Sequence, residues 1–103
     1  MEQQSRRGTV SILRIEHSVG DFSAWKQAFD SDPVGRERSG VRRYRVLRPI
    51  DDPNYVMIDL EFDTAEQARA LLEAMRAVWA GPARAIISDP QARIAEQLEE
   101  RVY

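Results

Sequence analysis

The chain has 103 residues and a mass of 11.8 kDa, which is the size of one domain and excludes a two-domain enzyme. Its 15 basic and 17 acidic residues give a net charge of -2, so bulk charge does not attract nucleic acid. Cysteine is absent, which excludes disulfides, thiolate catalysis and iron–sulfur clusters. A single histidine also argues against a metal cage, and we expect neither metal nor cofactor.

The sequence predicts neither a membrane span nor a secretion signal. No run approaches the ~20 apolar residues of a membrane span, and the opening MEQQSRRGTV has no apolar stretch typical of a signal peptide. We therefore expect a cytoplasmic protein with no membrane partner. Residues 1–8 are polar and are expected to form a disordered tail, and residues 9–103 are expected to form the folded domain.

The first half of the chain predicts a strand, a helix and a loop. Residues 9–17 (TVSILRIEH) are rich in β-branched side chains and favour a strand. Asp21 is placed to cap a helix that ends near Asp30, because Phe22, Trp25 and Phe29 then share one face. Residues 31–40 (SDPVGRERSG) have the composition of a loop.

Two further runs predict a hairpin. Residues 41–48 and 55–62 favour strands, and PIDDPN between them supplies turn residues. The second run alternates, so one set of side chains is expected to pack under the helices and the other to face away. The packed set is Val56, Ile58, Leu60 and Phe62, and the other set is Tyr55, Met57, Asp59 and Glu61. Arg43 and Arg45 are expected to pair across strands with Asp59 and Glu61.

The last third predicts a helix and an element of undecided type. Asp63 and Glu66 have the spacing of a capping box, and an apolar stripe runs from Ala68 to Trp79 before Gly81-Pro82 ends the helix. Asp89-Pro90 is expected to break the chain again. The segment QARIAEQLEERVY fits the spacing of either a strand or a helix, and its composition favours the helix. A strand there would complete a ferredoxin-like βαββαβ unit.

Three motifs carry a family resemblance over nearly the whole chain. They are I-E-H-x-V-x-D-F-x-x-W-K-x-x-F-D at residues 15–30, G-V-R-R-Y-R-V-L-R at 40–48 and D-D-P-N-Y-V at 51–56. Together they resemble small proteins of the dimeric α/β-barrel superfamily, which are related to antibiotic-biosynthesis monooxygenases and sometimes labelled cyclases. The resemblance implies an α+β ferredoxin-like fold with a four-stranded antiparallel sheet, assembled as a homodimer. It also implies a closing strand at residues 92–98, through D-P-Q-A-R-I at 89–94.

The same resemblance implies a small-molecule-binding protein. The superfamily includes oxygenases, polyketide cyclases, haem-degrading enzymes and stress proteins, so fold alone does not set the activity. The leading hypothesis is a cofactor-independent monooxygenase or polyketide-cyclase-like enzyme acting on an aromatic or polyketide substrate. The alternative is a non-catalytic dimeric binding or scaffold protein whose cleft is filled by its own side chains.

His17 is the candidate catalytic residue, because it alone titrates near neutrality without a large pKa shift. The competing interpretation is a structural histidine at a strand end that makes one backbone hydrogen bond. We expect His17 to border a polar-lined cavity at the junction with the first helix. Trp25 and Trp79 are candidate walls of that cavity, although core packing, or a dimer contact for Trp79, would also explain them.

Six arginines between residues 36 and 48 suggest either an anion site or a set of ion pairs. A nucleic-acid patch is disfavoured because the strand arginines alternate between two faces. Arg36 and Arg38 in the loop, or Arg43 in the strand, are candidate partners for a carboxylate or enolate oxygen of a substrate. Tyr44 and Tyr55 are candidate hydroxyl donors to the same ligand, and packing would explain both equally well.

Overall fold

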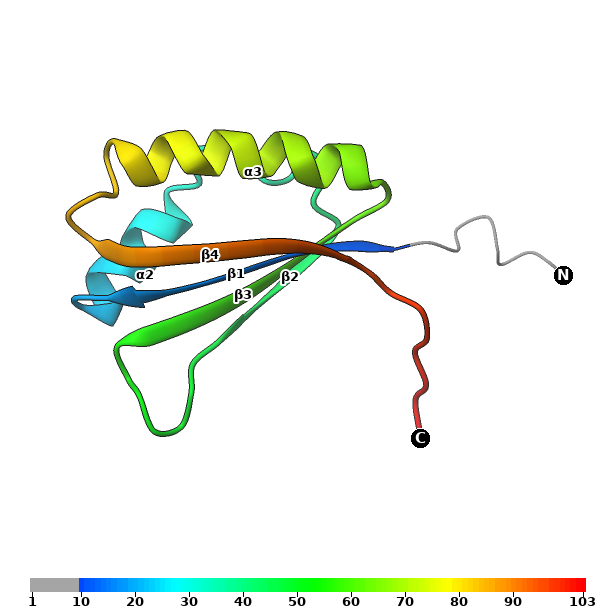
Figure 1. Ribbon diagram of the computed structural model, residues 1–103, viewed down its shortest axis with the longest axis horizontal. Helices are drawn as coiled ribbons and strands as arrows, with labels where there is room; N and C mark the ends of the chain where they lie inside the picture. Colours follow the sequence, from blue (N-terminus) through cyan, green and yellow to red (C-terminus); the bar gives the residue numbers. More distant parts are fainter. Residues whose placement is uncertain (1–9) are drawn as a thin grey trace, which may run out of the picture.

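The computed structural model describes residues 10–103, so the tail expected at residues 1–8 lies outside the described part of the chain. The elements follow one another in the order β-α-β-β-α-β (Figure 1). They are β1 (Ser11–Val19), α2 (Phe22–Asp30), β2 (Arg43–Leu47), β3 (Tyr55–Phe62), α3 (Ala65–Ala80) and β4 (Ile87–Glu96). Among these residues no helix is long and apolar enough to cross a membrane.

The four strands form one sheet in the order β2-β3-β1-β4, with every neighbouring pair antiparallel. Helix α3 lies along one face of this sheet (Figure 1), and α2 packs into the same core through Trp25 and Phe29. This arrangement confirms the predicted ferredoxin-like α+β fold. The hairpin of β2 and β3 is also confirmed.

The closing strand is confirmed against its local helix propensity, but with different bounds. β4 begins at Ile87 and ends at Glu96, whereas the expected strand covered residues 92–98. Asp89-Pro90 does not break it, because the strand accommodates both residues in a bulge opposite His17, with Asp89 at a φ of 53°. Pairing with the full length of β1 outweighs the helix propensity of the segment.

The core lies between the sheet and the two helices. Side chains at every second position of β1 and β3 are almost fully buried there, as the alternation in β3 predicted. Helix α3 adds Ala68, Leu71 and Leu72. The sheet side of this core consists of Leu13, Ile15, Val19, Val56, Ile58, Leu60, Phe62 and Ile87.

The capping box of α3 is one residue later than predicted. Thr64 is the N-cap: its hydroxyl accepts from the Gln67 N–H at 3.1 Å, and the Gln67 side chain accepts from the Thr64 N–H at 3.2 Å. Asp63 is instead ion-paired with Arg42. The prediction was wrong because Asp and Thr are both good caps, and only the backbone geometry selects between neighbours.

The opposite face of the sheet is polar and is covered by no described helix. Arg14 donates two hydrogen bonds to Asp59, at 2.8 and 3.1 Å. Arg43 and Arg45 lie 3.8 and 3.5 Å from Glu61, so the predicted cross-strand pairing is confirmed for Glu61, whereas Asp59 pairs with β1 instead. We call this surface the open face. Its main charged and apolar side chains are Ile12, Arg14, Glu16, Arg43, Arg45, Leu47, Tyr55, Met57, Asp59, Glu61 and Arg93.

Candidate functional site

A small apolar cavity of about 60 Å³ lies between the sheet and the helices. The sheet contributes Ile15 and Ile58 to its wall, and α2 contributes Trp25 and Phe29. The remaining lining comes from α2, α3, β3, β4 and the loops that follow the two helices. It comprises Ala28, Pro33, Val34, Arg36, Leu60, Leu71, Met75, Val78, Trp79, Ala83, Ile86 and Ile87. The only charged side chain in this lining is Arg36.

Both predicted tryptophans border this cavity. The Trp25 ring is 5% exposed and stacks on Phe29 with ring centroids 5.0 Å apart, because the two residues are one helical turn apart in α2. Trp79 is half-buried near the C-terminal end of α3. Trp25 is therefore both a core residue and part of the cavity wall, so its two alternative interpretations are compatible.

His17 is buried, and it does not line the cavity. It lies on the helix side of β1 at 1% exposure, with its ring edge-on to Trp25 at 6.0 Å and to Trp79 at 6.5 Å. The expectation of a polar-lined cavity bordered by His17 is therefore wrong: the cavity is apolar, and the two tryptophans that line it are the neighbours of the histidine ring. Strand alternation is the cause, because it places His17 on the same face as Leu13 and Ile15.

The environment of His17 favours a neutral ring. Burial lowers its pKa, because the charged form loses hydration, and the hydrogen bond from Nδ1 to the Ser18 carbonyl at 3.2 Å raises the pKa by a smaller amount. A neutral ring that donates through Nδ1 leaves Nε2 as an acceptor. His17 thus has the protonation state that a general base requires at pH 7.

The lowered pKa predicts a specific pH dependence of stability. In the unfolded chain His17 titrates near the ordinary value of about 6.5, and in the folded protein it titrates lower. The unfolded state therefore binds a proton first, so the free energy of unfolding should fall as the pH drops below about 6.5. Urea denaturation between pH 7.5 and 5.5 would measure this.

The matched control is His17→Gln, which removes the only histidine of the chain. This variant should have a flatter stability profile across the same pH interval. Identical profiles for the two proteins would contradict the assignment, because the loss of stability would then come from other groups.

Arg36 is held beside the cavity by contacts on several sides. Its Nη1 donates to the Phe29 carbonyl at 2.7 Å and lies 3.6 Å from the Asp32 carboxylate. The guanidinium carbon lies 3.9 Å from the centre of the Phe29 ring and 4.9 Å from that of Tyr44. The loop reaches this position through positive φ angles at Asp32 (55°) and Gly35 (65°), a region in which glycine is unstrained.

The other predicted ligand contacts are divided between surfaces. Tyr44 faces the helix side of β2, with its ring 5.2 Å from that of Phe29. With Arg36 and Arg43 it borders a polar hollow on the surface. Arg43 itself lies on the open face and does not line the apolar cavity.

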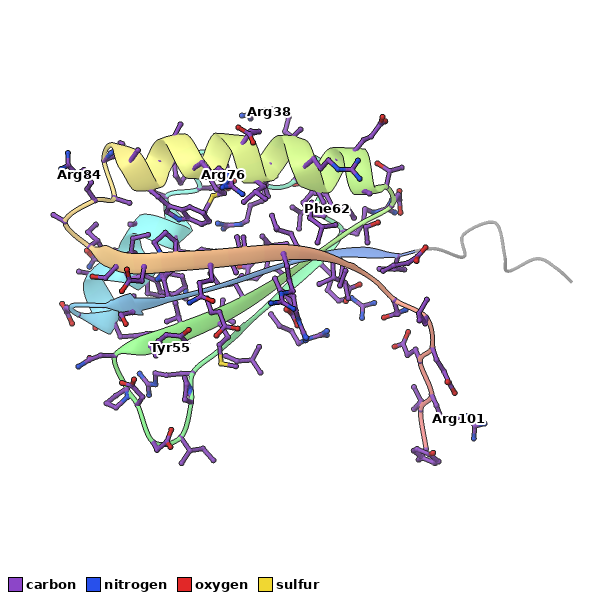
Figure 2. The ribbon with its side chains drawn as sticks, in the orientation of Figure 1. Arg38, Tyr55, Phe62, Arg76, Arg84 and Arg101 are labelled. Atoms are coloured by element: carbon purple, nitrogen blue, oxygen red, sulfur yellow. The ribbon has the colours of Figure 1, made fainter. Side chains whose placement is uncertain are left out.

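Tyr55 does not line the cavity. It lies on the open face, where its hydroxyl donates to Glu16 at 2.7 Å. Figure 2 shows Tyr55 below the sheet and Phe62 between the sheet and α3. The joint ligand site predicted for Tyr44 and Tyr55 is therefore wrong, because odd and even positions of antiparallel partners face opposite sides.

Sequence reasoning also missed part of the cavity wall. Ala83 and Ile86, in the segment between α3 and β4, line it together with Met75. The apolar stripe of α3 singled out Met75 as a core residue, but no pattern indicates that the following loop folds back over the cavity. Within residues 10–103 no cluster of three histidine, cysteine, aspartate or glutamate side chains could hold a metal ion.

No family model and no curated protein matches the sequence, whereas solved structures match the fold. A candidate antibiotic biosynthesis monooxygenase from Nitrosomonas europaea is 20% identical, with a TM-score of 0.69 over 86% of this chain and 90% of that one. SnoaB, a cofactor-independent oxygenase from Streptomyces nogalater, is 17% identical, with a TM-score of 0.62 over 91% and 95%. A dimeric ferredoxin-like protein from an uncultured marine organism is 8% identical, with a TM-score of 0.72 over 97% of both chains.

These identities establish a likeness of fold and leave activity open. The likeness extends over most of each chain, so it covers the whole βαββαβ unit, including the closing strand. The chain therefore has the ferredoxin-like fold of the antibiotic biosynthesis monooxygenase-like proteins.

Proposed function

We propose that this protein binds a small aromatic or polyketide-like molecule in the cavity between the sheet and the helices. The observation that carries the proposal is the composition of the wall: two tryptophans, a phenylalanine, a methionine and aliphatic side chains, with a single guanidinium. Apolar walls with few polar groups are typical of small-molecule sites, in which the polar groups orient the ligand.

We further propose that the bound molecule is oxidised or cyclised without a cofactor. In such chemistry a base removes an acidic C–H or phenolic proton, and the resulting anion reacts with dioxygen or with an electrophilic carbon of the same molecule. His17 is the proposed base, with Nε2 as the proton acceptor. Its access to the ligand requires Trp25 or Trp79 to move, because their rings are its neighbours. The fold likeness to SnoaB supports this proposal.

The size of the cavity favours the alternative of a non-catalytic dimeric protein. A volume of about 60 Å³ is well below the ~300–1,000 Å³ of typical ligand pockets. A polyketide would therefore need the half-buried Trp79 and the following loop to move outward. Without that movement, the cavity is a packing defect of a binding or scaffold protein.

A homodimer is the proposed assembly for either function. No helix within residues 10–103 covers the open face, which carries Met57 and the exposed Leu47 among its ion pairs. Burying such apolar surface is worth about 25 cal/mol per Å². Solved neighbours that are themselves dimeric ferredoxin-like proteins support this assembly.

Native mass spectrometry of the purified protein tests the function first, since a co-purifying molecule would identify the ligand. With that ligand as substrate, His17→Ala should lower turnover about 100-fold or more, the expected loss for a general base, while the dimer stays intact. His17→Gln, which keeps more of the side-chain volume, controls for packing. Unchanged turnover in both variants would rule out His17 as the base, and no turnover by the wild-type protein would favour the non-catalytic alternative. A parallel loss of dimer stability would mark His17 as structural.

A further inference from the structure

We infer that the ligand of the cavity carries one anionic oxygen group, a carboxylate, phenolate or enolate, and that Arg36 selects it. This inference rests on the proposed function and specifies the ligand class. Its basis is the hydrogen-bonding state of the Arg36 guanidinium.

Arg36 is nearly buried but uses only part of its donors. Its side chain is 14% exposed. Within residues 10–103 the guanidinium makes one hydrogen bond, from Nη1 to the Phe29 carbonyl, and Nε and Nη2 make none. A guanidinium has five N–H donors, and burying unsatisfied donors of a charged group is costly. The edge formed by Nε and Nη2 is the one that binds a carboxylate with two parallel hydrogen bonds.

The position of Arg36 fits a ligand with one charged end. Arg36 lines the apolar cavity, and it also lines the polar hollow that Arg42, Arg43 and Tyr44 border on the surface. A ligand with its rings among the tryptophans would therefore bring its polar end to this boundary. An uncharged apolar molecule would make no use of the donors that Nε and Nη2 offer at this boundary.

The acidic neighbour of Arg36 leaves this edge available. The Asp32 carboxylate lies 3.6 Å from Nη1, and it also accepts the Arg36 backbone N–H at 2.9 Å. It is thus engaged on the Nη1 side. The guanidinium carbon also contacts the rings of Phe29 and Tyr44, which are nearly perpendicular to each other, so the group is held from two sides.

The test uses two probes of nearly the same shape, the anionic 2-naphthoate and the neutral 2-naphthamide. Isothermal titration calorimetry at pH 7.5 gives the two dissociation constants, and the indole N–H signals of Trp25 and Trp79 in NMR spectra report binding at the cavity. Wild-type protein should prefer the carboxylate about tenfold to a hundredfold, the range expected for charge-assisted hydrogen bonds. Arg36→Met should reduce that preference to about twofold or less.

Two further variants control the interpretation. Arg38→Met removes the same charge from the same loop, but Arg38 does not line the cavity and lies on the outside of the molecule (Figure 2), so this variant should keep the preference. Arg36→Lys keeps the charge without the planar fork and should give an intermediate ratio. Circular dichroism establishes that each variant is folded, and Arg36→Lys serves if Arg36→Met is not.

The outcomes separate this inference from the proposed function. Equal binding of both probes at the indole signals would retain the cavity as a ligand site and overturn the anion preference. A preference that persists in Arg36→Met, or that is lost equally in Arg38→Met, would also overturn it. If neither probe binds or shifts an indole signal, the proposed function fails together with the inference.

Discussion

Replacing Trp25 by alanine is expected to lower the free energy of unfolding by about 3–5 kcal/mol, the usual cost of removing a large buried aromatic ring. Trp25 is 5% exposed and contacts Phe29 by stacking, with His17 and Phe22 as further ring neighbours. The variant would join the lost volume to an existing cavity, so the surrounding side chains cannot collapse to fill it. Urea denaturation at one fixed protein concentration measures the change, since a dimer would make stability concentration-dependent.

Trp79→Ala is the matched control, because this second tryptophan borders the same cavity but is only half-buried. It should cost less than about 2 kcal/mol, in proportion to the smaller area removed from water. Equal losses for the two variants would contradict the role of Trp25 as the central aromatic residue of the core.

Met57→Arg is expected to dissociate the proposed dimer, weakening it by about a hundredfold to a thousandfold. Met57 lies in the middle of β3 on the open face, opposite Glu16 and Leu47 on the neighbouring strands. The open face already carries four arginines against three acidic side chains, so a further cation adds repulsion between two identical faces. Like charges brought together at an interface cost several kcal/mol.

The monomer of this variant should still fold, because Glu16 lies directly opposite position 57 and can pair with the new guanidinium. Sedimentation velocity over a dilution series measures the association. Ile50→Arg is the control, since this fully exposed residue lies in the turn between β2 and β3. A wild-type protein that is monomeric at micromolar concentration would contradict the dimer itself, and an unchanged Met57→Arg dimer would place the interface elsewhere.

The residues of β3 illustrate how far local patterns extend. Apolar side chains occupy every second position of YVMIDLEF, and this alternation can be seen in the segment alone. It therefore predicted which side chains are buried without knowledge of the partner strands. The composition of residues 91–103 favoured a helix, although their spacing also fitted a strand, and pairing with β1 makes residues up to Glu96 a strand. Family resemblance corrected this prediction because it carries information about the complete fold.

The candidate site divides in the same way. The sequence by itself determined the order of the first five elements, the buried face of β3, and the choice of His17, Trp25, Arg36 and Trp79 as residues of interest. Only the tertiary structure decided that His17 lies next to the tryptophan rings and outside the cavity lining, and that Tyr55 faces the opposite side of the sheet. It also decided that the segment after α3 forms part of the cavity wall. The physical reason is that periodicity and propensity act between near neighbours in the chain, whereas a cavity is formed by side chains from distant elements whose register and packing no local pattern encodes.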